Sequence, residues 1–372
     1  MNAVRNTGIP IMRVDIIAET LGRSYSRIIC NGLPLKTFPS VMLWGPPGVG
    51  KSQGVRQIGD VIGKETGKRV VITDVRLLLF NPVDLRGIPT SNEDKTLAVW
   101  LKPKIFQMDP GDDIVNILFL DEISAAPQSV QAAAYQITLD RVVGEHALPD
   151  NCIVIAAGNR TTDKAVAFKM PSALANRLMH IEVEDNFESW KKWAVNSDIH
   201  PIVTGFLTFR QTMLMTFDPS KTDVLAFATP RSWEMVSNIL NHVSDDIDEV
   251  CGLIAGLVGT GTAMELRTWA QVYKELPSID DIFAGQCTEI PKRTDTLYAL
   301  VSSMVSYAKK HKDDMQLIAN SIEYADTIPA DFSVVLMSDY MYIEENYRNR
   351  LLSIPAFTKW LRKKGKMING IV

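Results

Sequence analysis

The stretch Gly45-Pro46-Pro47-Gly48-Val49-Gly50-Lys51-Ser52 decides how this chain is interpreted, because it fits the phosphate-binding pattern G-x-x-x-x-G-K-[ST]. An apolar run at residues 41–44 precedes it, and a helical pattern from residue 51 to about 62 follows it. Glycines in such a loop let backbone N–H groups turn toward phosphate oxygens, and the helix adds its positive end. Lys51 would then reach the β- and γ-phosphates of a nucleotide, and Ser52 would ligate Mg²⁺.

Composition narrows the class of protein. The 372 residues are 22% charged and 46% hydrophobic, which predicts a globular protein of two or three domains. The net charge of −4 gives no global attraction to nucleic acid or to an anionic membrane. The four cysteines form no C-x-x-C pair and no secretory signal is recognisable, so we expect reduced thiols and a cytoplasmic location. The longest apolar stretch, residues 253–263, is too short to span a bilayer. No ligand spacing indicates a structural metal.

The chain divides by the pattern of its apolar residues. Short apolar runs separated by helical segments predict a parallel sheet in an α/β fold, with strands at residues 41–44, 69–73, 115–120, 152–157 and 179–183. After residue 186 only helical patterns follow. We therefore expect an N-terminal helical segment (1–39), an α/β nucleotide-binding core (40–186), a helical domain (187–279) and a C-terminal helical extension (280–372).

Two carboxylates, Asp121 and Glu122, end the third predicted strand. Hydrolysis of a nucleotide needs an acid for Mg²⁺ and a base beside the γ-phosphate. Neighbouring residues at a strand end point in different directions, so Asp121 can face the metal while Glu122 faces the attacking water. The alternative is an acidic helix cap after a buried strand, which the phosphate loop upstream disfavours.

Three further polar residues follow in order. Asn159, after the fourth predicted strand, would orient the lytic water or contact the γ-phosphate, although Gly158-Asn159 is also an ordinary turn dipeptide. Arg177, just before the last strand, is either a surface helix residue or an arginine that projects into a neighbouring subunit's nucleotide site. Arg231, behind a Thr229 cap candidate and Pro230, opens a helix of the second domain and would touch nucleotide from there.

Taken together, the loop and the segments L-F-L-D-E-I, A-A-G-N, A-N-R-L and A-T-P-R resemble the AAA+ ATPases, and specifically the MoxR group. The resemblance covers roughly residues 30–275. It implies a P-loop AAA+ domain, a parallel five-stranded sheet flanked by helices, followed by an all-helical lid over residues 187–279 and a C-terminal helical region. It also implies that the strand at residues 179–183 lies at the far edge of the sheet.

The resemblance assigns a role to each residue. Lys51 is similar to the Walker A lysine, Asp121 and Glu122 to the Walker B pair, and Asn159 to sensor 1. Arg177 resembles the arginine finger that acts in trans, and Arg231 the sensor 2 arginine of the lid. Arg160 is a second candidate for the trans-acting arginine, and residues 165–170 match no feature of the family.

Two insertions support the MoxR assignment. Residues 81–89 and 97–100 read as the arms of a hairpin whose polar tip is residues 91–95. Residues 141–148 read as a second hairpin that turns near Gly144. They resemble the helix-2 insert and the pre-sensor-1 hairpin, which face the central pore of the ring in this clade. Ordinary surface hairpins are the alternative.

The resemblance implies a Mg²⁺-dependent ATPase that forms a homo-hexameric ring and remodels a protein partner in a chaperone-like manner, with a von Willebrand factor A-domain protein as the expected partner. A nucleic-acid-associated AAA+ motor or loader is the first alternative, which the net charge and the lack of a basic stripe disfavour. A small-molecule P-loop kinase or a nucleotide-gated binding module is the second. Glu122 beside Asp121, with Arg231 in a lid, favours hydrolysis.

Overall fold

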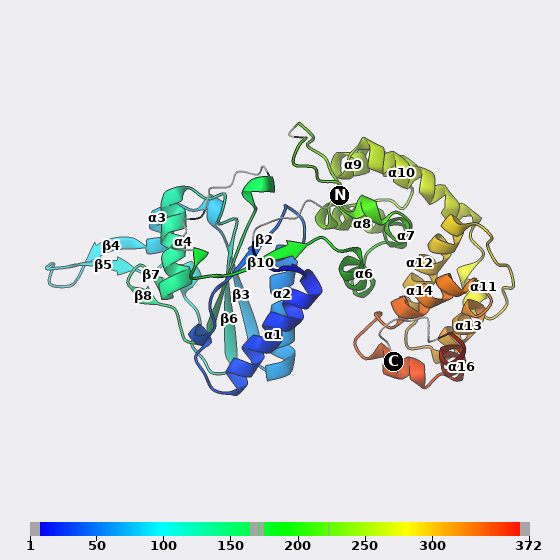
Figure 1. Cartoon of the computed structure of the whole chain (residues 1–372), viewed down its shortest axis with the longest axis horizontal. Coiled ribbons are helices and arrows are strands. Elements are labelled where there is room, and N and C mark those ends of the chain that lie inside the picture. The colour runs from blue at the N-terminus through cyan, green and yellow to red at the C-terminus, as the bar shows by residue number, and fades with distance from the viewer. Residues whose placement is uncertain (1–7, 164–169, 171–174, 222, 365–372) are drawn as a thin grey trace. The chain divides into compact units, whose positions relative to one another are not determined.

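The computed structural model describes residues 8–163, 170, 175–221 and 223–364, and the chain forms two compact units (Figure 1). Unit 1 comprises Met1–Asp185 with Asp218–Thr222, and unit 2 comprises Asn186–Phe217 with Asp223–Val372. Residues 165–170 match no feature of the family, and all of them except residue 170 lie outside the described part. None of the described helices is both long and apolar enough to cross a membrane.

Unit 1 is built on a sheet of six parallel strands in the order β1-β10-β2-β9-β6-β3. The strands are β1 (Ile11–Arg13), β2 (Val41–Trp44), β3 (Arg69–Arg76), β6 (Ile114–Asp121), β9 (Cys152–Gly158) and β10 (Met179–Glu184). The five strands predicted from apolar runs are confirmed. The sixth, β1, was missed because three residues leading into a helix show no periodicity of their own. It pairs with β10, so the expectation that the strand at 179–183 forms the edge of the sheet is wrong.

Helices cover both faces of this sheet. Residues of β6 alternate: Ile117 and Phe119 pack with α1 (Val14–Cys30) and α2 (Lys51–Thr66), while Leu118 and Leu120 pack on the other face with α4 (Gln128–Asp140). The first two helices approach closely, since a Cβ atom on Gly22 of α1 would lie 2.6 Å from the Cγ1 atom of Val61 in α2. The N-terminal helix therefore shares the hydrophobic core of unit 1.

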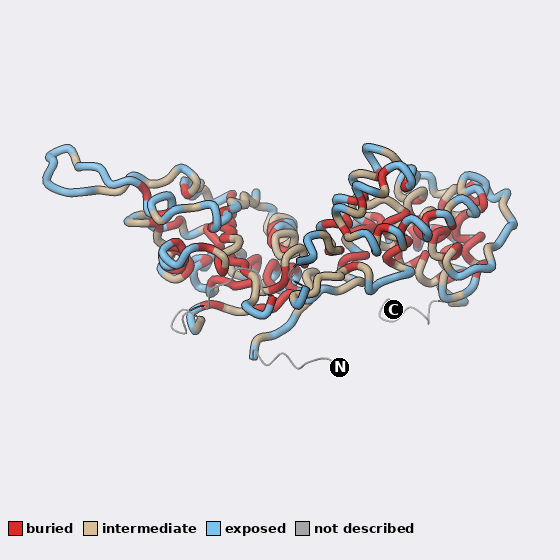
Figure 2. Tube along the Cα trace, turned by 90° about the horizontal axis from the view of Figure 1, so that it is seen from above, coloured by how far each residue is buried: buried red, intermediate tan, exposed pale blue. Residues whose placement is uncertain are grey.

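Both predicted hairpins are confirmed as hairpins, and they lie together. The first pairs β4 (Ile88–Ser91) with β5 (Ala98–Leu101), after the short helix α3 (Pro82–Arg86), and extends away from unit 1 as an exposed arm (Figure 2). The second pairs β7 (Val142–Val143) with β8 (His146–Ala147). A ring nitrogen of His146, Nε2, lies 2.8 Å from the carbonyl oxygen of Trp100 in β5. Gly144 has no room for a side chain, because a Cβ atom would lie 2.5 Å from the Arg86 carbonyl oxygen.

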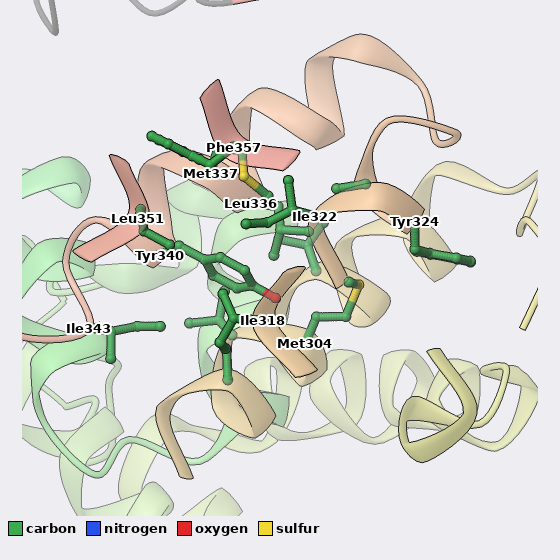
Figure 3. Close-up of a cluster of buried hydrophobic side chains, with 14 of the residues drawn as sticks. Met304, Ile318, Ile322, Tyr324, Leu336, Met337, Tyr340, Ile343, Leu351 and Phe357 are labelled. Atoms are coloured by element: carbon green, nitrogen blue, oxygen red, sulfur yellow. The ribbon is translucent and has the colours of Figure 1, made fainter. Parts of the chain in front are cut away.

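The described part of unit 2 is helical and holds two hydrophobic clusters. The first is formed mainly by α6 (Phe187–Asn196), α7 (Pro201–Phe209), α8 (Pro230–His242), α9 (Ile247–Val258) and α10 (Thr260–Ala270). The second, drawn in Figure 3, is formed mainly by α11 (Ile279–Phe283), α12 (Thr294–Lys310), α13 (Met315–Ala325), α14 (Ala330–Tyr340), α15 (Tyr347–Leu352) and α16 (Pro355–Lys364).

The two clusters of unit 2 are joined by packing and by charge. Helix α7 packs along α12, and a buried ion pair at 2.9 Å joins Lys191 of α6 to Asp339 of α14. Within the second cluster the Tyr340 hydroxyl donates a hydrogen bond to Ser321 Oγ at 3.0 Å. A buried charge is stable only when it is paired, so this ion pair fixes how α6 sits on the C-terminal helices.

Candidate nucleotide site

The loop after β2 has the backbone that the sequence pattern requires. Strand β2 ends at Trp44 and α2 begins at Lys51, with Gly50 as its N-cap residue. Gly48 and Gly50 have φ angles of +76° and +104°, a region that residues with a Cβ atom rarely adopt. The Gly45 N–H donates to the Gly158 carbonyl at 3.3 Å, which ties the start of the loop to the end of β9. The predicted strand–loop–helix arrangement is present.

Lys51 is held by hydrogen bonds to the backbone of this loop and to Asn159. Its Nζ donates to the carbonyl oxygens of Gly45 at 2.6 Å and Pro46 at 3.0 Å, and to Asn159 Oδ1 at 3.0 Å. These partners directly follow β2 and β9, and the carboxyl ends of these two parallel strands meet at one edge of the sheet. A bound phosphate would compete with the carbonyl oxygens for the ammonium group, because a charged acceptor forms the stronger hydrogen bond.

Ser52 and Asp121 meet at the same edge. The Ser52 hydroxyl donates to Asp121 Oδ2 at 3.2 Å. A hydroxyl and a carboxylate are oxygen ligands, which suit Mg²⁺, and neither group is fully buried. The pair therefore fits the metal-binding role predicted for Ser52 and Asp121.

Glu122 has an unusual backbone. Its φ angle is +58°, which is uncommon for a residue with a long side chain, and such strain often accompanies functional sites. The turn is fixed by two hydrogen bonds: the Glu122 N–H donates to Asp121 Oδ1 at 2.8 Å, and the Ile123 N–H donates to the Ala157 carbonyl at 3.0 Å. The chain therefore turns sharply between the two carboxylates, as their separate predicted roles require.

Asn159 owes its place to the close fit of the residue before it. A Cβ atom on Gly158 would lie 2.8 Å from Ser124 Oγ and 2.9 Å from Met42 Cε. The Asn159 N–H donates to the same Ser124 Oγ at 2.9 Å, and its side chain reaches Lys51. The structure thus places Asn159 in the site, so Asn159 does more than form an ordinary turn with Gly158.

Asp74 is a residue of this edge that the sequence reasoning missed. In β3 it lies opposite Phe119 of β6, two positions before the pair formed by Arg76 and Asp121. Desolvation, followed by the charge of Asp121, raises the pKa of the Asp74 carboxyl. The signal was present in the sequence: an acid follows the apolar run at residues 69–73, as Asp121 follows the run at 115–120.

Arg177 lies at the opposite edge of the sheet, where β2 and β10 begin. It comes two residues before β10, whose first residue, Met179, pairs with Val41 at the start of β2, whereas the phosphate loop follows the end of β2. Four strand residues separate the two edges by roughly 13 Å. The exposed Arg177 side chain lines a cavity of about 590 Å³ at this edge and has no hydrogen-bond or ion-pair partner among the described residues. Arg177 is therefore not part of its own chain's site.

Arg160, the other candidate for a trans-acting arginine, is occupied within unit 1. Its guanidinium forms an ion pair with Asp163 at 2.6 Å and a second with Glu182 of β10. Both carboxylates are buried, so withdrawing Arg160 would break two ion pairs that are shielded from water. This arrangement favours Arg177 over Arg160.

Arg231 belongs to unit 2, where it lies in the first turn of α8. Thr229 caps that helix: its hydroxyl accepts from the Ser232 N–H at 3.1 Å, and Ser232 Oγ accepts from the Thr229 N–H at 2.7 Å. The predicted cap and the Pro230 start are confirmed. The role of Arg231 toward nucleotide stays a prediction.

Comparison with known proteins finds one family model that matches the part of the chain that holds this site. Residues 40–180 match the family model described as "ATPase family associated with various cellular activities (AAA)". This stretch of the chain is therefore similar to the ATPase domain that the model describes. No curated protein matches the chain significantly. Among solved structures, a mutant of Thermotoga maritima RuvB is similar at 14% identity and a TM-score of 0.34, over 79% of this chain and 83% of RuvB.

A second solved structure, Brucella abortus NtrX in complex with ADP, is similar at 14% identity and a TM-score of 0.34, over 94% of this chain and 68% of NtrX. Both similarities are too distant to say what this chain binds. The AAA domain match and the geometry of the site are what carry the interpretation.

Lys51→Ala is expected to abolish nucleotide binding measured by calorimetry, because it removes the cation that the loop holds for the β- and γ-phosphates. Lys64→Ala, which removes an exposed lysine from the last turn of the same helix, is the control and should bind normally. A thermal melt shows whether Lys51→Ala is folded. A folded Lys51→Ala variant with native affinity would mean that this loop is not the phosphate-binding loop.

Proposed function

We propose that this chain is a Mg²⁺-dependent ATPase of the MoxR type that works as a ring and remodels a protein partner in the cytoplasm. The observation that carries the proposal is the meeting of Lys51, Ser52, Asp121 and Asn159 at one edge of the sheet, with Glu122 in the turn beside them. These are the groups that ATP hydrolysis needs, and they come from segments far apart in the sequence.

Each residue has a chemical task in this proposal. Lys51 binds the β- and γ-phosphates, and Ser52 and Asp121 hold the Mg²⁺ that neutralises charge on the same phosphates. Glu122 accepts a proton from the attacking water. Asn159, already hydrogen-bonded to Lys51, orients that water or the γ-phosphate. Arg231 has the role of the sensor 2 arginine in this proposal.

The position of Arg177 supports a ring. An exposed guanidinium that has no partner among the described residues, at the edge of the sheet opposite the phosphate loop, is suited to act on the nucleotide of a neighbouring subunit. An arginine donated in this way stabilises the charge that develops during phosphoryl transfer. One copy of the chain would then hold an incomplete site, and a homo-hexamer of the MoxR type would complete all six.

The paired hairpins support a protein partner. Ile88, Leu97 and Leu101 on the first hairpin are each more than half exposed, and the second hairpin supports its base through His146 and Trp100. Exposed apolar side chains in one place mark a surface for polypeptide rather than for phosphate backbone. We propose that this arm contacts a polypeptide, and that the partner carries a von Willebrand factor A domain.

Shortening the arm is the experiment that tests this role. Ser91 pairs with Ala98, so an Asn-Gly turn can replace residues 92–97 and still close the hairpin. We expect basal ATPase activity to stay within about twofold, because the tip lies away from the residues that contact phosphate. The stimulation by the von Willebrand factor A-domain protein encoded nearest to this chain should be lost.

A control of equal length replaces Glu93, Asp94 and Lys95 by serine, which separates the effect of length from that of charge. Loss of basal ATPase in a folded, shortened variant would place the arm in the active site instead. Stimulation of the native chain by DNA, and not by the protein partner, would favour the nucleic-acid motor.

A further inference from the structure

A side-chain hydrogen bond joins the strand that carries the phosphate loop to the strand that follows Arg177. Trp44 is the last residue of β2 and directly precedes Gly45. Its indole Nε1–H donates to Nδ1 of His180 in β10 at 2.9 Å, and the two rings lie 20° from parallel with centroids 6.0 Å apart. Both side chains are half-buried. The two residues are 136 positions apart in the chain, so only the fold brings them together.

The other nitrogen of His180 continues the connection. Nε2 lies 2.7 Å from the carbonyl oxygen of Ala175. An indole N–H can only donate, so Nδ1 of His180 must be the acceptor and the ring proton must reside on Nε2. Nε2–H therefore donates to Ala175, and one tautomer of the neutral imidazole satisfies both neighbours.

The Ala175 carbonyl belongs to the turn that presents Arg177. It also accepts from the Leu178 N–H at 3.4 Å, which closes the four residues 175–178 around Arg177. The contacts thus run from Gly45 through Trp44 and His180 to Ala175 and the arginine turn. They run along two neighbouring strands, from the end of β2, which leads into the phosphate loop, to the start of β10, which follows Arg177.

We propose that Trp44 and His180 are positioning residues, which couple the nucleotide bound by one subunit to the arginine that this subunit offers to the next. This inference rests on the proposed function, in which Arg177 acts in trans. Lys51 is hydrogen-bonded to the carbonyl oxygen of Gly45, so a phosphate that takes Lys51 changes the contacts of the residue after Trp44. The rigid pair of rings then transmits a shift of the loop to the turn at Ala175.

Two substitutions break the two links separately. His180→Asn places an amide oxygen near the position of Nδ1 and keeps an acceptor for Trp44, but it does not reach Ala175. His180→Gln places an amide nitrogen near the position of Nε2 and keeps a donor for Ala175, but it loses the acceptor for Trp44. Trp44→Phe removes the indole donor and keeps an aromatic ring. His242→Gln, at an exposed position near the end of α8, is the matched control.

The readout is the ATPase rate of mixed rings in which one kind of subunit only donates its arginine. Acceptor subunits carry Arg177→Ala. Donor subunits carry either Glu122→Gln, which retains ATP, or Lys51→Ala, which stays empty. With native His180 we expect the ATP-bound donor and the empty donor to differ by about tenfold in the rate they support, because small displacements of a catalytic group have large effects on rate.

That difference should disappear when the donor also carries His180→Asn, His180→Gln or Trp44→Phe, while binding of a fluorescent ADP to the Glu122→Gln donor's own site stays unchanged. A difference that survives in all folded variants would overturn the coupling. If no donor with native His180 restores any activity, Arg177 does not act in trans, and the proposed function fails instead. The two failures are therefore distinct.

Discussion

Glu122→Gln is expected to bind ATP as the native chain does and to hydrolyse it on the order of 10²–10⁴-fold more slowly. Glutamine keeps the shape of the side chain but cannot accept a proton from water. The contacts that hold the metal pair and the turn do not use the Glu122 carboxylate: Ser52 donates to Asp121, and Asp121 accepts from the Glu122 backbone N–H. Binding and hydrolysis should therefore separate in this variant.

Phosphate release and the nucleotide retained after desalting are the two measurements. Glu145→Gln, an exposed acid in the turn of the second hairpin, is the control and should hydrolyse ATP at the native rate. A native rate in Glu122→Gln itself would show that Glu122 is part of the turn and not the base.

Much of the nucleotide site could be predicted from the sequence because its signals are local. Gly48 and Gly50 mark the loop where backbone φ angles are positive, and Asp121 and Glu122 directly follow a buried apolar strand. The carboxyl ends of neighbouring parallel strands meet at one edge, so naming the strands also predicted which residues come together. Lys51 and Asn159 meet for this reason.

Other features depend on strand register, which the sequence does not show. The ion pair between Arg160 and Glu182 and the hydrogen bond between Trp44 and His180 join segments through the pairing of β2, β9 and β10. Strand β1 is too short to carry a pattern of its own. Because β1 pairs with β10, β10 is not the edge strand of the sheet. Asp74 was overlooked although it directly follows the predicted strand end at residue 73; the strand itself continues to Arg76.

Arg177→Ala is expected to leave nucleotide binding intact and to lower the rate of ATP hydrolysis by roughly 10³–10⁵-fold, the range known for arginines that stabilise phosphoryl transfer. The variant should fold normally, because Arg177 is exposed and has no partner among the described residues of its own chain. Its own loop, Mg²⁺ ligands and Glu122 are unchanged. In the proposed ring, what this variant lacks is the group that it would offer to another subunit.

The account's central claim is that the active site is completed by a second copy of the chain, and a mixing experiment tests it most directly. Arg177→Ala subunits, inactive but with a sound loop and Glu122, are titrated with inactive Glu122→Gln subunits, which keep Arg177. A Glu122→Gln, Arg177→Ala double variant is the control, because it joins the same rings without an arginine to donate. ATPase activity should appear only in the first mixture. Mixed rings that form and stay inactive would contradict the claim.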